Sequence, residues 1–532
     1  MKIKYLALAI SASALLYGCG GDSNNDENGD GGRDVGGEAA LSFPASQVAS
    51  DWYEQGEAVV AAAAQKQVNN EVGAAKNVIL FVGDGMGIST VTAARILAGQ
   101  MQGLDGEEYQ LSFEKMPFTG LIKTYNTNQQ TPDSAGTMTA MMSGVKTKAG
   151  VIGVAEGAVR SDCASSQGKE LVTALELAED QGKATGIIST ARITHATPAA
   201  TYSKSPERNW ESDDNLTAEA TTNGCKDIAD QLVSFDIGDG IDVVMGGGRR
   251  HFLPTADGGK RTDSRDLTDE WKTAHPSGSY LQTGTELAAL DAASATQVLG
   301  LFSSSHMSYD SDRQANSKDE PSLSEMTSKS IDILSKDEDG FFLMVESGRI
   351  DHGHHAGSAY SALTDAVEFA NAIQAAMDKT SEEDTLIIVT ADHSHVFTIA
   401  GYPTRGNPIL GKVVTNDGSG EPESTPALAA DSMPYTTLGY TNGLGFAELG
   451  DEHDADARYG SAIDAGRKDL AAVNTESPGY HQETLVPLSS ETHAGEDVGV
   501  WARGPGAHLL TGTNEQSLIF HVMAHAGGLL PE

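Results

Sequence analysis

Basic side chains are scarce in this chain of 532 residues, which has 35 Lys and Arg against 75 Asp and Glu and a formal net charge of −40. Recognition of a nucleic-acid backbone needs concentrated positive charge, so the deficit excludes nucleic-acid binding. It also excludes attachment to anionic lipid through basic residues. Wholesale disorder is not indicated, because 39% of the residues are hydrophobic and short apolar runs recur.

Hydrophobic runs long enough to cross a bilayer are also missing. Lys2 and Lys4 precede an apolar stretch that ends at residue 17, whereas a spanning helix needs about 20 residues. The stretch leads into Leu16-Tyr17-Gly18-Cys19, which is similar to a bacterial lipoprotein signal. We therefore expect residues 1–18 to be a signal peptide and the protein to be exported to the periplasm or cell surface. A lipid on Cys19 would be the protein's only attachment to a membrane, and we expect that membrane to be the outer membrane. The alternative is that the signal peptide is cleaved nearby and Cys19 carries no lipid.

Cysteine is rare, with three residues in the whole chain. If Cys19 carries lipid, Cys163 and Cys225 remain, and two remaining thiols in an oxidising compartment favour a disulfide. The bond would close a loop of about 60 residues and contribute roughly 4 kcal/mol in the chain-entropy model. Two buried free thiols are the alternative.

The chain divides into a tether and one large domain. Residues 19–44 are rich in Gly, Asp and Asn and predict a flexible acidic tether, followed by a domain over 45–532 that opens with an Ala-rich helical stretch at 51–68. Helical stretches at 169–181 and 324–335 lie between short apolar runs. Those runs are 77–82, 184–189, 241–245, 341–345 and 385–390. Continuous apolar strands alternating with helices predict an α/β fold, with a sheet buried on both faces and largely parallel. Residues of about 401–485 interrupt this rhythm and are interpreted as an insertion.

Polar groups follow several of these strands where an α/β sheet binds its ligands, beyond the carboxyl ends. Asp84 follows the first run within a Gly-rich turn, Glu346 follows the fourth, and Asp392 with His393 follows the fifth. Carboxylate and imidazole together suit Zn²⁺, whereas carboxylate, hydroxyl and water suit Mg²⁺.

Two further segments carry candidate groups. Asp351 and His355 have i, i+4 spacing, which a helical turn would place on one face. Ser134 follows a turn and precedes a run of small residues, so on its own it is most simply a helix N-cap. A Gly-x-Ser-x-Gly elbow is absent, which leaves metal activation as the route to a nucleophilic serine. His521 and His525 share the i, i+4 spacing without a carboxylate nearby and are interpreted as structural.

Five motifs in order resemble the alkaline phosphatase family, over residues of about 45–530. They are Gly83-Asp84-Gly85-Met86-Gly87, Pro132-Asp133-Ser134-Ala135, Arg349-Ile350-Asp351-His352-Gly353-His354-His355, Ala391-Asp392-His393-Ser394-His395 and Glu491-Thr492-His493-Ala494-Gly495-Glu496-Asp497. His195 and His352 stand where the best-known enteric bacterial type has Asp and Lys, so the resemblance is closer to the animal enzymes. Cys163 and Cys225 also fall where the animal-type enzymes have a disulfide.

The resemblance implies a three-layer α/β sandwich with two Zn²⁺ and one Mg²⁺ per subunit. The residues matched to the metals are Asp351, His355 and His493 for the first zinc, Asp84, Asp392 and His393 with Ser134 for the second, and Asp84, Thr197 and Glu346 for magnesium. His195 and His352 would lie just outside this set. Ser134 would be the nucleophile that becomes phosphoserine, and Arg208 would grip the phosphate in a bidentate fork.

The implied activity is hydrolysis of phosphate monoesters, with a broad substrate range and an alkaline optimum. The family also implies a homodimer in which the 401–485 insertion forms a crown-like subdomain. This sequence departs from the vertebrate members of the family at one point. Those members have a fourth site, for calcium, and a Glu in the matching segment, whereas this chain has Leu301-Phe302-Ser303-Ser304 there. We therefore do not expect that fourth metal.

Two alternatives remain open. A phosphodiesterase or sulfatase of the same superfamily would share the metal ligands, although the sulfatase signature is absent around Ser134. A non-catalytic zinc-binding lipoprotein would need neither Ser134 nor Arg208.

The acidity of the chain points to its habitat, because few of the 75 carboxylates serve as ligands. Removal of the signal peptide makes the net charge −42. Salt would screen the repulsion between this charge and an anionic substrate, so we expect a salt-adapted enzyme.

Overall fold

The computed structural model describes residues 75–530. The predicted signal peptide, the lipid on Cys19, the tether over 19–44 and the helical stretch at 51–68 lie outside the described residues. Within 75–530, the model contains no helix whose length and hydrophobicity would let it cross a membrane.

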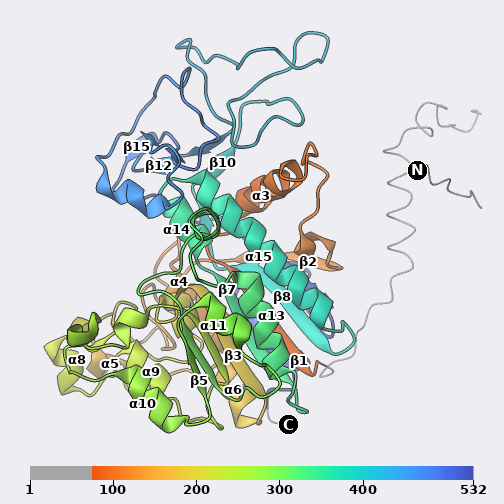
Figure 1. Cartoon of the computed structure of the whole chain (residues 1–532). Helices are drawn as coiled ribbons and strands as arrows, with labels where there is room; N and C mark the ends of the chain where they lie inside the picture. Colours follow the sequence, from red (N-terminus) through yellow and green to blue (C-terminus); the bar gives the residue numbers. More distant parts are fainter. Residues whose placement is uncertain (1–74, 531–532) are drawn as a thin grey trace, which may run out of the picture. The chain divides into compact units, whose positions relative to one another are not determined.

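A sheet of ten strands forms the centre of the fold (Figure 1). In spatial order its strands are β18 (Gly512–Glu515), β2 (Phe118–Lys123), β17 (Val498–Arg503), β8 (Thr385–Ala391), β1 (Asn77–Gly83), β7 (Phe341–Ser347), β3 (Ala184–Arg192), β4 (Val243–Gly247), β6 (Val298–Leu301) and β5 (Ser279–Leu281). Only β17 runs antiparallel to its two neighbours in this sheet. All five predicted strands are present, and the predicted mostly parallel α/β fold is confirmed.

Helices cover both faces of the sheet, and strands such as β7 and β8 are therefore buried at every position. One group includes α13 (Leu323–Leu334) and α15 (Ala359–Lys379), which pack in front of the sheet in Figure 1, and α3 (Ile88–Gln100), which packs against α15. The other group contains α4 (Ser134–Ser143), α6 (Ala174–Asp180), α7 (Ala196–Ala199) and α16 (Leu518–Ala526). The shorter helices are α5 (Cys163–Ser166), α8 (Ala218–Thr222), α9 (Ile228–Val233), α10 (Leu267–Ala274), α11 (Gly284–Ala289) and α12 (Asp310–Ala315).

The helix predicted over 169–181 is shorter in the structure. It begins at Ala174 because Thr173 caps it, accepting a hydrogen bond from the Glu176 amide while the Glu176 side chain accepts from the Thr173 amide. The residues before it pair with another segment instead: the Leu171 amide donates to the carbonyl of Gly153. The second predicted helix, 324–335, matches α13 within one residue.

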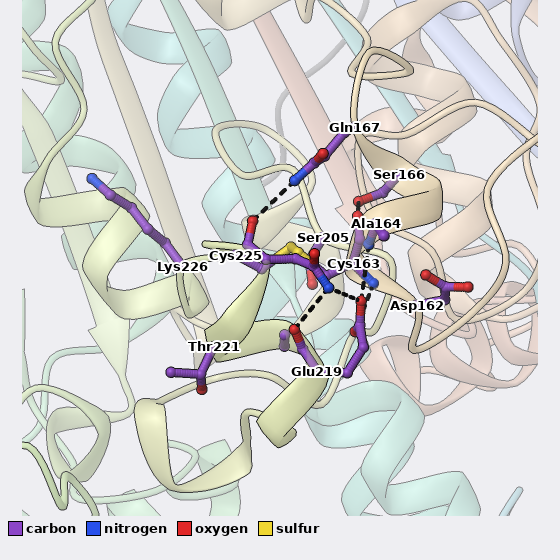
Figure 2. The surroundings of a disulfide bond; sticks show 12 residues. Asp162, Cys163, Ala164, Ser166, Gln167, Ser205, Glu219, Thr221, Cys225 and Lys226 are labelled. Carbon is purple, nitrogen blue, oxygen red and sulfur yellow. Dashed lines mark hydrogen bonds between the residues drawn. A yellow bond between two sulfur atoms is a disulfide. The ribbon is translucent and has the colours of Figure 1, made fainter.

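The predicted disulfide between Cys163 and Cys225 is present and links α5 to the loop after α8 (Figure 2). Glu219 supports the same junction, since its carboxylate accepts hydrogen bonds of 3.0 Å from the amides of both Cys163 and Ala164. The bonded cysteines pack against Trp210 in a small buried cluster. The bond therefore ties together two short helices on the periphery of the sheet.

The segment over 401–485 has little regular structure, which fits the loss of strand and helix rhythm there. Most of it consists of loops with short strand pairs. The pairs in and around it are β10 (Phe397–Ile399) with β11 (Leu438–Tyr440), β12 (Asn442–Gly443) with β15 (Val486–Pro487), and β13 (Ala447–Glu448) with β14 (Tyr480–His481). One 3-10 turn, η5 (Ala455–Gly460), packs back against α14 (Arg349–His355).

Candidate active site

Three carboxylates meet at the carboxyl ends of neighbouring strands. Asp84 follows β1, Glu346 lies near the end of β7, and Asp392 follows β8; all three residues are 0% exposed. The parallel register explains the convergence, because Val82 is opposite Glu346, and Gly83 is opposite Ala391. The four strands β8, β1, β7 and β3 are adjacent in the sheet, so residues that follow them share one edge.

A first cluster contains Asp351, His355 and His493. Asp351 and His355 are one helical turn apart on α14, with 3.3 Å between Asp351 Oδ1 and His355 Nε2. His493 lies in the short strand β16 (His493–Ala494), which pairs with β9 (Ser394–His395). Its Nε2 is 3.3 Å from Asp351 Oδ1 and 3.1 Å from His355 Nε2. Three ligand atoms therefore converge from two segments, α14 and β16, that are far apart in sequence.

The backbone orients both histidines of this first cluster. His355 Nδ1 lies 2.7 Å from the carbonyl oxygen of Glu491, and His493 Nδ1 lies 2.8 Å from that of Pro132. A carbonyl oxygen only accepts, so each Nδ1 carries the proton and each Nε2 presents its lone pair to the cluster. Burial lowers the pKa of His355, which favours this neutral form.

A second cluster joins Asp84, Asp392 and His393 to Ser134. His393 Nε2 is 3.4 Å from a carboxylate oxygen of Asp84, 3.4 Å from one of Asp392, and 3.3 Å from the hydroxyl of Ser134. Burial lowers the pKa of His393 well below its usual value. The serine therefore lies beside a neutral imidazole and two carboxylates with little access to water.

Ser134 is not the N-cap of its helix, contrary to the simplest interpretation of the sequence. Asp133 is the cap of α4, and its carboxylate accepts a hydrogen bond of 3.2 Å from the Gly136 amide. Ser134 is the first helical residue, so its hydroxyl has no capping role to fulfil and is directed to His393 instead. The first turn of α4 thus presents a hydroxyl at the positive end of a helix.

A third group brings Glu346 and Thr197 to Asp84. Buried oxygens of all three lack a hydrogen-bond partner within the described chain: both carboxylate oxygens of Asp84, Oε1 of Glu346 and the hydroxyl of Thr197. The other oxygen of Glu346 accepts from the Ser189 hydroxyl. His195 offers a nitrogen to the same group as Asp84 and Glu346. An oxygen-rich site with unsatisfied acceptors suits a hard divalent cation.

Burial disfavours the charged forms of Asp84, Asp392 and Glu346 in the second and third groups. Burial and the neighbouring Asp392, Asp351 and Glu346 carboxylates raise the pKa of Asp84 well above its usual value. Burial raises the pKa of Glu346 to about 7. So many buried carboxylates need compensating cations, and divalent metal ions supply that compensation best.

Arg208 points its guanidinium toward the same region. One Nη is 3.0 Å from Asp133 Oδ2, and the other is 3.2 Å from His195 Nε2. The side chain is 18% exposed, so part of the fork remains open. His195 in turn packs edge-on against His306 and at a tilt against His352, with ring centroids 5.4 and 5.6 Å away. These contacts hold the Arg208 guanidinium beside the Asp and His clusters that could bind metal ions.

The chain as a whole is similar to proteins of known activity. A family model described as alkaline phosphatase matches residues 75–529 of the chain. The chain belongs to the alkaline phosphatase family. The tissue-nonspecific alkaline phosphatases of chicken and human are each 45% identical to it, over 90% and 89% of the chain and 89% and 88% of their own lengths. A solved alkaline phosphatase from Thermus thermophilus superimposes with a TM-score of 0.60 at 26% identity, covering 88% of this chain and 95% of its own.

Membership of the alkaline phosphatase family makes this protein a phosphomonoesterase. The family and the clustered Asp and His side chains together support the binding of divalent metal ions. All the residues matched to the family's metals lie at the strand-end edge of the sheet described above. His521 and His525 lie elsewhere, on exposed positions of α16.

One residue of this alkaline phosphatase site had no assigned role in the sequence analysis. His395 Nε2 is 2.8 Å from Asp351 Oδ1, and its Nδ1 is 2.6 Å from Glu491 Oε2. Although burial opposes its charge, the Glu491 and Asp351 carboxylates raise the pKa of His395 to about 10. Both nitrogens therefore carry protons, so His395 orients Asp351 instead of acting as a metal ligand. Its position two residues after His393, in one of the motifs that carry the resemblance, was the available signal.

Proposed function

We propose that this phosphomonoesterase transfers the phosphoryl group to Ser134 at a site holding two Zn²⁺ and one Mg²⁺, and then hydrolyses the phosphoserine. The observation that carries the proposal is the Ser134 hydroxyl, 3.3 Å from His393 Nε2, at the N-terminus of α4 and close to Asp84 and Asp392. No elbow or catalytic triad is needed to activate a serine in such a place.

The donor sets fit the three ions. Asp351, His355 and His493 would hold the first zinc; Asp84, Asp392 and His393, with Ser134, would hold the second; Asp84, Glu346 and Thr197 would hold magnesium. When bound, these ions lower the pKa of the serine and neutralise charge that develops during phosphoryl transfer. The unsatisfied oxygens of Asp84, Glu346 and Thr197 support the third assignment.

The chain's own groups account for the remaining steps. Ser134 gives its proton to solvent and attacks phosphorus in line, while the alcohol oxygen leaves from the opposite side and takes up a proton from solvent. Arg208 binds two phosphate oxygens with its planar fork, a geometry that lysine cannot supply. Asp133 holds that fork at 3.0 Å and also caps α4, so one carboxylate positions both the nucleophile's helix and the phosphate ligand. Water then releases phosphate and restores the serine.

The test uses Ser134→Ala beside the wild-type enzyme. We expect the variant to keep its bound zinc and magnesium, measured by elemental analysis, and to lose turnover of p-nitrophenyl phosphate at alkaline pH by a factor of at least about 10³. A variant with full metal content and full activity would show that Ser134 is not the nucleophile. Chelation should abolish wild-type activity and zinc add-back should restore it, whereas activity insensitive to complete zinc removal would reject the metal assignment.

The same assays address the rival activities. Faster turnover of a diester or a sulfate ester than of a monoester would favour the phosphodiesterase or sulfatase alternative. Metal binding without turnover of any of these esters would favour the non-catalytic zinc protein. A broad monoester range and an alkaline optimum are part of the proposal.

We place the enzyme outside the cytoplasm, in the periplasm or at the cell surface, with Cys19 as the lipid attachment point. We further propose a homodimer in which the segment over 401–485 forms a crown-like subdomain, and a salt-adapted enzyme. The loop-rich structure of that segment and the net charge of −40 support these two points. Loss of activity and solubility with rising NaCl would refute the salt adaptation while leaving the phosphatase mechanism intact.

A further inference from the structure

The ring of His306 packs against two histidines beside the three clusters. Its centroid is 5.4 Å from that of His195, in an edge-on contact, and 4.0 Å from that of His352, with 57° between the ring planes. The residue belongs to the loop that follows β6, where the Met307 amide donates a hydrogen bond of 3.0 Å to the carbonyl of Thr190. His306 therefore reaches the edge of the site from a strand that supplies none of the residues of the three clusters.

Arg192, the last residue of β3, fixes the plane of the His306 ring. Its backbone amide lies 3.3 Å from His306 Nδ1, and its guanidinium contacts Nε2 of the same ring. Glu211 holds the guanidinium in turn, accepting two hydrogen bonds of 2.7 Å in a bidentate pair. The side chains of Arg192 and Glu211 are 13% and 10% exposed, so this pair is largely buried. The His306 ring therefore has little freedom to turn.

The ring of His195 has only one hydrogen bond to orient it. Its Nε2 accepts from Arg208 at 3.2 Å, because a guanidinium only donates, so Nδ1 carries the proton. That Nδ1 is buried and has no hydrogen-bond partner within residues 75–530. The two histidines of the first cluster differ, because a backbone carbonyl holds Nδ1 in each of them. Contacts with the rings of His306 and His352 therefore take the place of a second hydrogen bond in orienting His195.

We propose that His306 is a positioning residue for Arg208. It holds the ring of His195 so that Nε2 faces one Nη of the guanidinium, while Asp133 holds the other Nη at 3.0 Å. Two fixed contacts keep the planar fork in one orientation, and a bidentate contact with phosphate needs that orientation. His306 thereby raises the affinity of the site for the phosphoryl group through another residue. This step rests on the proposed role of Arg208.

The test measures the inhibition constant of inorganic phosphate, together with kcat and KM for p-nitrophenyl phosphate. His306→Ala and His306→Gln both remove the ring, although Gln retains an oxygen that can accept from Arg192. We expect each variant to raise the inhibition constant and KM about tenfold and to change kcat less than about threefold, because Arg208 grips the phosphoryl group before transfer as well as during it. His306→Phe keeps a ring that can pack on His195 and should stay within about threefold of the wild type.

Two comparisons separate positioning from a general structural effect. In an Arg208→Ala background, His306→Ala should change the phosphate inhibition constant less than about twofold, because the group that it positions is gone. His251→Ala is the matched control, since His251 Nε2 lies 3.4 Å from Glu211 and so approaches the same ion pair from its acidic partner. This control should leave the inhibition constant within about twofold. Elemental analysis should find the metal content of the wild type in every variant.

Several results would overturn the proposal. They are an unchanged inhibition constant in both ringless variants, an equal loss in His306→Phe or in His251→Ala, and the same loss in the Arg208→Ala background. A loss of bound metal that parallels the loss of affinity would also overturn it, because His306 would then act on the cation sites. Failure of the proposed function looks different. Arg208→Ala itself would then leave the inhibition constant unchanged, which removes the basis of both proposals, whereas an active Ser134→Ala would refute the nucleophile and let the coupling of His306 to Arg208 stand.

Discussion

Removing His395 would leave two buried carboxylates facing each other without the cation between them. Its imidazole contacts Asp351 at 2.8 Å and Glu491 at 2.6 Å, and these two residues are 4% and 1% exposed. Breaking a buried pair by deleting one partner costs about 3–5 kcal/mol, because the remaining charge stays desolvated. We therefore expect His395→Ala to lower the free energy of unfolding by this amount, and to weaken metal retention at the first cluster because Asp351 loses its orientation.

The assay is urea unfolding at pH 7.5 and a fixed metal concentration, repeated in a Glu491→Gln background. Without the Glu491 charge, the cost of His395→Ala should fall to about half, since only Asp351 then loses a charged partner. His521→Ala, an exposed histidine on α16, is the control and should change stability by less than about 0.5 kcal/mol. A loss below about 1 kcal/mol for His395→Ala, or the same loss in both backgrounds, would refute the reasoning.

Three further outcomes are expected. Burial raises the pKa of Glu179 to about 8, above the usual 4.5, so the folded state holds a proton that the unfolded state releases, and stability should fall as pH rises from about 4.5 to about 8. Glu179→Gln should remove that loss. In urea titrations it should raise the free energy of unfolding on the order of 3 kcal/mol at pH 9 and change it little at pH 4.5. Equal effects at both pH values would contradict this prediction. Cys163→Ser should cost about 4 kcal/mol of unfolding free energy, because the bond spans a sequence separation of 62, while leaving kcat within about twofold; a drop in kcat as large as that of Ser134→Ala would contradict the peripheral role. Arg208→Lys should lower kcat/KM for phosphate esters by about 10-fold or more with unchanged metal content, and an unaltered value would exclude the bidentate contact.

The regular part of the fold follows from local patterns. The apolar run over 341–345 became β7 because each of its side chains is buried from one face or the other, and the same holds for 385–390 in β8. Predicting parallel neighbours then predicted that Asp84, Glu346 and Asp392 would meet. The antiparallel strand β17 was missed, because its pairing with β2 and β8 joins distant segments and leaves no local signature.

Local rules also misjudged the start of α4. Either Asp133 or Ser134 can cap a helix, and the sequence alone favoured Ser134. The structure selects Asp133, whose carboxylate also binds Arg208 and the Gly150 amide. Contacts made by distant residues therefore decided which of two equivalent caps is used.

The sequence by itself determined the acidic charge, the α/β class and the candidate ligands at the strand ends, and it favoured a bond between Cys163 and Cys225 that the structure then showed. These properties depend on composition, on continuous apolar runs that alternate with helical stretches, and on the small number of cysteines. Only the tertiary structure decided that His395 lies between two buried carboxylates, those of Asp351 and Glu491. The physical reason is that these contacts join segments that are 44 and 96 residues apart, and no local periodicity specifies that such segments meet.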